Sequence, residues 1–240
     1  MSTERLGSML SDALRYPLND DKWLRTILIG GLLSVLTVVV IPIFFLQGYF
    51  VRVLRGVANG DSQPPAFNDW GDLFIDGVKL LVVNILLSLV VLAVMLVIGA
   101  LFGAGSLLSG AGPGADPGPG GLIAVLGVVG FLLFLVIALA IGYVAPAMFA
   151  NFAREDSLAA AFDVSTILAG VTTGEYLTAW VLAIAVAVVL GTIASLLSAV
   201  VIGIFGLFYV QVVTFYLFAR GFADGLDDHG SYGGANKARV

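Results

Sequence analysis

The sequence contains no cysteine, a single histidine and very little charge. Without cysteine no disulfide framework and no thiolate metal site can form. A lone His229 leaves neither a histidine-based metal site nor a nucleophile–base pair. Charged residues make up 11% of the 240 residues and hydrophobic residues 60%, whereas soluble domains carry about 25% charge. These deficits exclude a soluble enzyme, a nucleic-acid-binding protein and a secreted disulfide-rich domain.

The few charges are confined to short segments, which leaves four long runs without Asp, Glu, Lys or Arg. These runs are residues 26–51, 80–115, 117–153 and 176–219. Because a helix needs about 20 apolar residues to cross a bilayer, each run is long enough to enter a membrane. The sequence predicts an all-α, polytopic transmembrane helical bundle. Residues 1–225 are expected to form a single integral membrane domain, followed by a polar tail over 226–240.

The first apolar segment, Ile27 to Val53, is interrupted by Pro42, and neither piece reaches the length of a full span. A single kinked span would give five spans in total and divide the 11 Lys and Arg residues seven to four. A re-entrant hairpin would give four full spans and place all 11 on one side. The positive-inside rule favours the re-entrant hairpin, with the basic loops and both termini in the cytoplasm.

Amphipathic, acidic segments precede an apolar run three times, at residues 1–26, 61–79 and 151–175. Each following run can be drawn as a hairpin. In the second segment aromatic residues share one helical face and carboxylates occupy the other. The aromatic face holds Phe67, Trp70 and Phe74, and the acidic face holds Asp69, Asp72 and Asp76. This pattern predicts a helix that lies in the membrane interface with its carboxylates in water.

Three amide side chains, Gln47, Asn84 and Gln211, interrupt the apolar runs. An amide inside the membrane can line a solute path or bind an ion. The alternative is a hydrogen bond between neighbouring helices, which is the more common use of such residues. We favour this second interpretation for each of them.

Two prolines and several small residues are expected to shape the helices. Pro42 and Pro146 are predicted helix breaks. The pairs Gly99 with Gly103, and Gly191 with Ser195, have the spacing that lets helices approach closely. We expect these residues to allow close packing of helices within the chain, which we favour over a dimer interface.

The sequence offers no catalytic residues, no cofactor site and no metal site. The Asp69 and Asp72 carboxylates have acid–base chemistry in principle, but they fit the solvated face of an interfacial helix. The glycine-rich stretch at 103–121 lacks the lysine and the strand context of a phosphate-binding loop. The sequence therefore predicts a protein that is not an enzyme.

Several motifs together resemble a known family. They are Ala13 to Asp20 leading to Trp23; Gly30-Gly31; Gly48-Tyr49 followed by Arg52; Pro64 to Phe74 with Asp76-Gly77; and Phe208-Tyr209 before Gly221. This pattern resembles an uncharacterised family of archaeal membrane proteins, catalogued as domain of unknown function 4013 and common in haloarchaea. The resemblance implies an archaeal cell membrane and agrees with the acidic, lysine-poor composition. It implies no activity.

Two functions remain open from the sequence. The first, slightly preferred, is a non-enzymatic membrane scaffold or accessory subunit, because the apolar runs contain no charge. The second is a small-solute or ion channel or permease with its site at the broken helices. The expected partners are the lipid bilayer and either a second copy or another membrane protein; no nucleic acid is expected.

Overall fold

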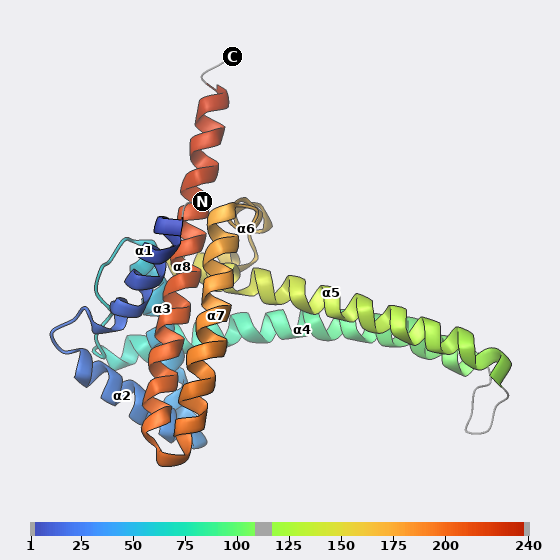
Figure 1. Ribbon diagram of the computed structural model, residues 1–240, viewed down its shortest axis with the longest axis horizontal. Helices are drawn as coiled ribbons and strands as arrows, with labels where there is room; N and C mark the ends of the chain where they lie inside the picture. Colours follow the sequence, from blue (N-terminus) through green and yellow to red (C-terminus); the bar gives the residue numbers. More distant parts are fainter. Residues whose placement is uncertain (1–2, 109–116, 238–240) are drawn as a thin grey trace. The chain divides into compact units, whose positions relative to one another are not determined.

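The structure is a computed structural model that describes residues 3–108 and 117–237, with the side chains of 101–127, Val200 and residues from 230 onward outside the description. Within the described residues every regular element is a helix (Figure 1), as predicted. The α-helices are α1 (Thr3–Arg15), α2 (Trp23–Val35), α3 (Ile41–Ala58), α4 (Trp70–Leu108), α5 (Pro117–Glu155), α6 (Val164–Val171), α7 (Gly174–Leu197) and α8 (Ile202–Lys237).

Short 3-10 helices connect several of these elements: η1 (Tyr16–Leu18), η2 (Leu36–Val38), η3 (Leu158–Phe162) and η4 (Ser198–Val200). Five helices in the described part of the chain are long and apolar enough to cross a membrane. They are Ile41–Ala58, Trp70–Ala100, Val128–Glu155, Gly174–Leu197 and Ile202–His229.

The chain divides into two compact units. The first, called the bundle unit, comprises Met1–Val83 and Val144–Val240, and the second, called the hairpin unit, comprises Asn84–Tyr143. The hairpin unit consists of the later part of α4 and the earlier part of α5. Residue 226 marks no break in secondary structure, because α8 continues through it to Lys237.

Helix α1 has the amphipathic pattern that the sequence predicts. It ends at Arg15, immediately before the turn that contains Pro17, because proline disfavours helical backbone in the residue before it. Ala13 is fully buried, and α1 contacts α7 and α8. The N-terminal segment is therefore a packed part of the bundle unit.

The first apolar segment forms a helical hairpin. Helix α2 and η2 run to Val38, the chain turns back over Val39 and Val40, and α3 begins at Ile41 (Figure 1). Pro42 lies in the first turn of α3, where its missing N–H removes no helical hydrogen bond. Both helices pack on α8. The reversal shows that this segment is a helical hairpin and not one kinked helix. Its re-entry from one side of the membrane stays a prediction, because α3 is itself long enough to count among the five candidate spans.

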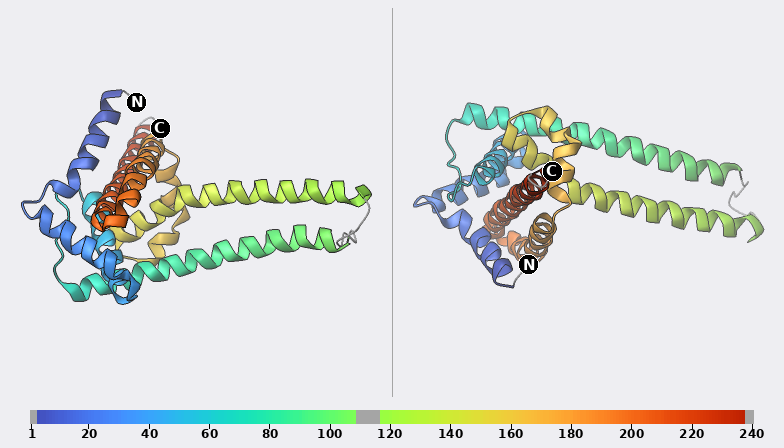
Figure 2. Two further views of the ribbon diagram at one scale, coloured as in Figure 1. Left: turned by 60° about the horizontal axis from the view of Figure 1, so that its bottom comes forward. Right: turned by 90° about the horizontal axis from the view of Figure 1, so that it is seen from above.

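Helices α7 and α8 form the second hairpin of the bundle unit and lie side by side in all views (Figures 1 and 2). Their turn falls at η4. The closest approach is at Gly203, where an added Cβ would lie 2.1 Å from the Ala194 carbonyl oxygen. Gly191 lies farther from α8, since its added Cβ would be 4.0 Å from Val210, and Ser195 is exposed.

The two hairpin turns lie at the same end of the bundle unit (Figure 1). Exposed aliphatic residues form both: Val38 is 90% exposed, Val40 67%, Leu196 75% and Ile202 70%. At the other end the helices carry the basic residues, for example Arg25 in α2, Arg55 in α3 and Arg220 in α8. One apolar end and one charged end fit a bundle that enters a bilayer from one side.

Aromatic side chains fill the space between α3, α8 and the loop before α4. The Tyr49 ring stacks on Phe67 with centroids 4.3 Å apart, and Phe50 stacks on Phe215 at 4.7 Å. Phe208 packs beside Tyr49 at 5.4 Å. Because rings of this size contribute large buried areas, this cluster fixes α3 against α8.

The second amphipathic segment differs from its prediction. Residues 70–76 are the first turns of α4, continuous with the apolar run, and do not form a separate interfacial helix. Asp69 and Asp72 are exposed as expected, but Asp76 is only 6% exposed. The helical pattern placed these residues on one face correctly. A pattern within one segment could not show that α3, which contributes Arg55, would cover Asp76.

Candidate functional site

The bundle unit contains a four-residue ion-pair network at its charged end. The Arg55 guanidinium lies 3.2 Å from Asp76 Oδ2 and 3.1 Å from Asp156 Oδ1. Lys79 Nζ lies 2.9 Å from the same Asp156 oxygen and 4.0 Å from Asp76 Oδ1. Two cations therefore alternate with two carboxylates, which balances the charge of the network.

Three separate elements position these side chains. Arg55 comes from the last turn of α3, whereas Asp76 and Lys79 are one turn apart on α4. Asp156 follows the end of α5 with a φ of +48°. Arg55 Nε also donates a hydrogen bond to the Ala153 carbonyl oxygen at 3.0 Å, satisfying a carbonyl that the end of α5 leaves without a helical partner.

The network changes the acidity of its outer carboxylate. The hydrogen bond from Lys79 lowers the pKa of Asp156 below its ordinary value, and the charges of Arg55 and Lys79 act in the same direction. Asp156 therefore stays ionised at neutral pH. A carboxylate that is ionised and paired with two cations is poorly placed to act as a general acid or base.

A second arginine of α3 holds the loop that leads into α4. Arg52 Nη1 donates to the Asn68 carbonyl oxygen and to Asn68 Oδ1, both at 2.9 Å, and Nη2 donates to the Asp69 carbonyl oxygen at 3.2 Å. Asp69 has a φ of +47°, a conformation that Asp tolerates better than most residues. The Asn-Asp pair thus shapes the entry into α4.

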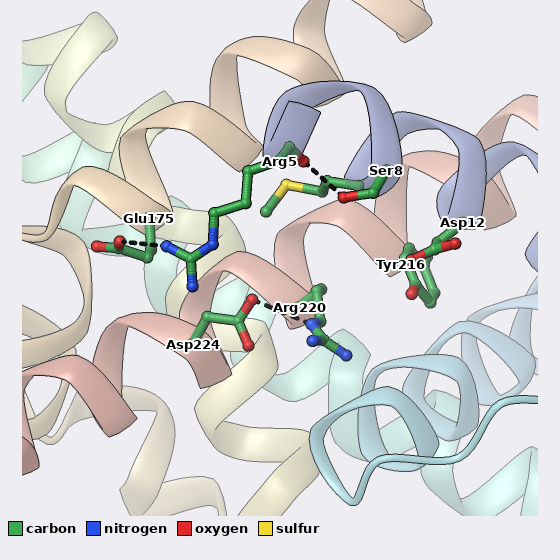
Figure 3. A pocket seen from close by; sticks show the side chains of 8 residues that line it. Arg5, Ser8, Asp12, Glu175, Tyr216, Arg220 and Asp224 are labelled. Carbon is green, nitrogen blue, oxygen red and sulfur yellow. Dashed lines mark hydrogen bonds and ion pairs between the residues drawn. The ribbon is translucent and has the colours of Figure 1, made fainter. Parts of the chain in front are cut away.

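The bundle unit also has a polar cavity of about 120 Å³ between α1, α7 and α8 (Figure 3). Arg5 reaches across it to Glu175 at 3.6 Å, and Arg220 pairs with Asp224 at 3.0 Å. Asp12 lies beside Tyr216 on the opposite wall (Figure 3).

This polar cavity has room for water or a small charged molecule, but its two cations already have partners. Both guanidiniums pair with carboxylates of the same cavity. Half of the Arg220 side chain and two-thirds of the Arg5 side chain face solvent. Exposed pairs of this kind are weak, so the cavity functions as a solvated contact between α1 and the two helices.

The structure does not gather the predicted amides around a cavity. Gln47 is half-buried on α3 and Gln211 is exposed on α8. Asn84 is half-buried in the hairpin unit and has an interaction partner. None of the three lines a cavity described for the bundle unit.

The remaining predicted positions have separate outcomes. Pro146 lies inside α5, which continues through it to Glu155, so it does not end the helix. An added Cβ at Gly99 would meet no atom within 4 Å. Gly103 lies where side chains are outside the described residues. The expected GxxxG packing stays a prediction.

Two pairs of residues that sequence reasoning missed hold α3 and α4 together. An added Cβ at Gly48 would lie 1.8 Å from the Leu73 carbonyl oxygen, and one at Gly77 would lie 1.9 Å from the Phe44 carbonyl oxygen. Each glycine therefore lets the partner helix approach its backbone. Both glycines belong to the motifs that carry the family resemblance, but nothing in the sequence indicated that they allow the helices to approach.

No metal-binding group of three or more His, Cys, Asp or Glu residues occurs among the described residues. No curated protein and no solved structure matches the chain. The family model described as "Protein of unknown function (DUF4013)" matches residues 31–199. That match includes the end of α2, all of α3, the Arg55–Asp156 network and α7. It covers more than half of the sequence, so the protein belongs to this family.

Proposed function

We propose that the protein is a non-enzymatic membrane scaffold or accessory subunit. The observation that carries this proposal is the make-up of the hairpin unit. It is formed by the apolar later part of α4 and the apolar earlier part of α5. Two paired helices leave their outer faces uncovered within their own unit, and in lipid such faces can associate with helices of another protein through van der Waals packing.

The charges of the bundle unit support the same function. Arg55, Asp76, Lys79 and Asp156 neutralise one another, and Arg52 is occupied by the loop before α4. These interactions hold separate segments of the same chain together. A scaffold needs such fixed connections, whereas a transport cycle needs polar groups that face a path.

The permease hypothesis predicts that Gln47, Asn84 and Gln211 line one water-filled path. The described cavities give no support to such a path, because none includes any of these amides. We therefore do not carry transport forward as a second function.

We further propose that the charged end of the bundle unit faces the cytoplasm of an archaeal cell. The basic residues of α2, α3 and α8 lie away from the two apolar turns, and the positive-inside rule assigns such an end to the cytoplasm. The excess of acidic over basic residues, 16 against 11, supports a salt-rich setting.

Photo-cross-linking in cells would test the scaffold. A benzophenone amino acid at Leu89 of α4 or Leu132 of α5, both more than half exposed, should give a discrete protein adduct. The same group at Val188 of α7, which is 60% exposed, is the matched control. Proteoliposomes of the purified protein should show no flux of glycerol or potassium above empty vesicles. Saturable flux, or lipid adducts alone at Leu89 and Leu132, would contradict the proposal.

A further inference from the structure

Two apolar grooves run along α7 in the bundle unit. The upper groove, about 250 Å³, is lined by Leu10 and Leu14 of α1 and by Leu182, Ala185, Val186, Val189 and Leu190 of α7. The lower groove, about 380 Å³, extends from Ile27 of α2 and Leu190 of α7 down to Leu197 and Ile202. The lower groove lies within the charge-free runs 26–51 and 176–219, so in a membrane it faces acyl chains and not water. The upper groove also includes Leu10 and Leu14, which belong to the charged segment 1–26.

The two grooves adjoin each other. Leu190 lines both. The Tyr209 hydroxyl, from a residue of the lower groove, donates a hydrogen bond to the carbonyl oxygen of Leu14, which lines the upper groove. From this junction at Leu190 to Leu197 the lower groove extends along α7 for about 10 Å towards the apolar turn. The lower groove is therefore long enough for the first part of a lipid chain.

Among the residues with described side chains, the cations without an ion pair or hydrogen bond all lie at the corner between α1 and α2. Of the nine Lys and Arg residues with described side chains, six form ion pairs or hydrogen bonds. The other three are Arg15, Lys22 and Arg25, and all three are exposed. Arg15 follows Leu14 of the upper groove, and Arg25 lies two residues before Ile27 of the lower groove.

We propose that this corner and the lower groove bind one anionic membrane lipid, with the phosphate at Arg15, Lys22 and Arg25 and an acyl chain along the lower part of α7. Because Asp20 and Asp21 belong to the same segment, residues 15–25 carry a net charge of only +1. Recognition therefore depends on direct hydrogen bonds from the guanidiniums and the ammonium to phosphate oxygens. A neutral headgroup, which shares the acyl chain but carries no net charge, would gain less from these contacts.

Native mass spectrometry of the full-length protein in detergent would test the site. The probes are dioleoylphosphatidylglycerol and dioleoylphosphatidylcholine, which share their acyl chains and differ in net charge. We expect the first phosphatidylglycerol molecule to bind about fivefold more tightly than the first phosphatidylcholine molecule. This ratio corresponds to the contribution of about one Lys or Arg in contact with the phosphate. The triple variant R15Q/K22Q/R25Q should bind both lipids equally.

Two controls separate the site from general effects. The charge-matched variant R5Q/R154Q/R220Q changes the net charge equally and should keep the preference for phosphatidylglycerol. Ile193→Trp fills the lower groove and should weaken binding of both lipids several-fold, whereas Val188→Trp, at an exposed position of α7 outside both grooves, should not. Equal affinity for the two lipids, a preference that survives R15Q/K22Q/R25Q, or equal effects of the two tryptophans would overturn the proposal.

Discussion

Arg55 and Asp156 lie 101 positions apart in the sequence, yet Arg55 Nη2 is 3.1 Å from Asp156 Oδ1. Asp156 also accepts a hydrogen bond from Lys79 at 2.9 Å. Through this carboxylate the segment after α5 is tied to both α3 and α4. The charged end of the bundle unit is therefore held by contacts between segments that precede and follow the long apolar runs.

Replacing Arg55 by Gln should destabilise the protein by about 2 kcal/mol. The loss leaves the Asp76 carboxylate, which is 9% exposed, without its closest cation. Breaking a fully buried pair costs about 3–5 kcal/mol, and the 29% exposure of the Arg55 side chain reduces this value. Unfolding in mixed detergent micelles with increasing dodecyl sulfate would measure it. Asp72→Asn, at an exposed position one turn earlier, should change the stability by less than about 0.5 kcal/mol.

Gly48→Ala and Gly77→Ala should each cost at least about 2 kcal/mol. A Cβ at either position would overlap a backbone carbonyl oxygen of the facing helix, and a backbone cannot move aside as a side chain can. Gly71→Ala is the matched control in α4, because an added Cβ there meets no atom within 4 Å. It should be neutral or slightly stabilising, since alanine favours helix over glycine. Equal losses at Gly71 and Gly77 would show that close approach is not the cause.

The start of α6 should lose protection as the pH falls from about 4 towards 2. The hydroxyls of Thr166 and Ser165 and the Thr166 amide bond the Asp163 carboxylate and lower its pKa from 3.8 to about 2. A carboxylate with a depressed pKa stabilises the folded state above its unfolded pKa, and this contribution disappears as it is protonated.

Hydrogen exchange of the α6 amides, corrected for intrinsic rates, would measure this loss. Asp163→Asn is the control, because Asn can cap a helix but does not titrate. Its protection should be the same at pH 5 and pH 2.5. Asp163→Ala should lack the protection at both values, and a pH-dependent change in the Asn variant would assign the effect to another group.

The sequence predicted the helical class and the break at Pro42 from local composition, and it favoured a hairpin there from the distribution of Lys and Arg. Runs without charge must be helical in lipid, and proline and small residues mark where they turn. The sequence did not predict that Asp76 would be buried. Its burial depends on Arg55, and no periodicity within one helix reveals which distant cation will cover it.

The same limit applies to the amides. Gln47 and Gln211 were singled out because they are polar within apolar runs, but their surroundings depend on how α3 and α8 pack. The glycines of the α3–α4 contact carried no chemical signal at all. Positions that matter through the absence of a side chain become visible only when the partner backbone is in place.

Cysteine labelling would establish which side of the membrane each polar segment occupies. The chain has no native cysteine, so each single substitution reports alone. Asn59, after α3, and Ser157, after α5, should share one side, because Arg55 bonds the Asp156 carboxylate between the same two segments. If the charged end faces the cytoplasm, an impermeant maleimide added to intact cells should not label N59C or S157C. Both should become labelled once the membrane is permeabilised. Gly112, in the stretch between Lys79 and Arg154 that contains no Lys or Arg, should react from outside. If N59C reacts in intact cells and S157C does not, α3 and the end of α5 open to opposite sides, and the Arg55–Asp156 pair cannot exist in the membrane.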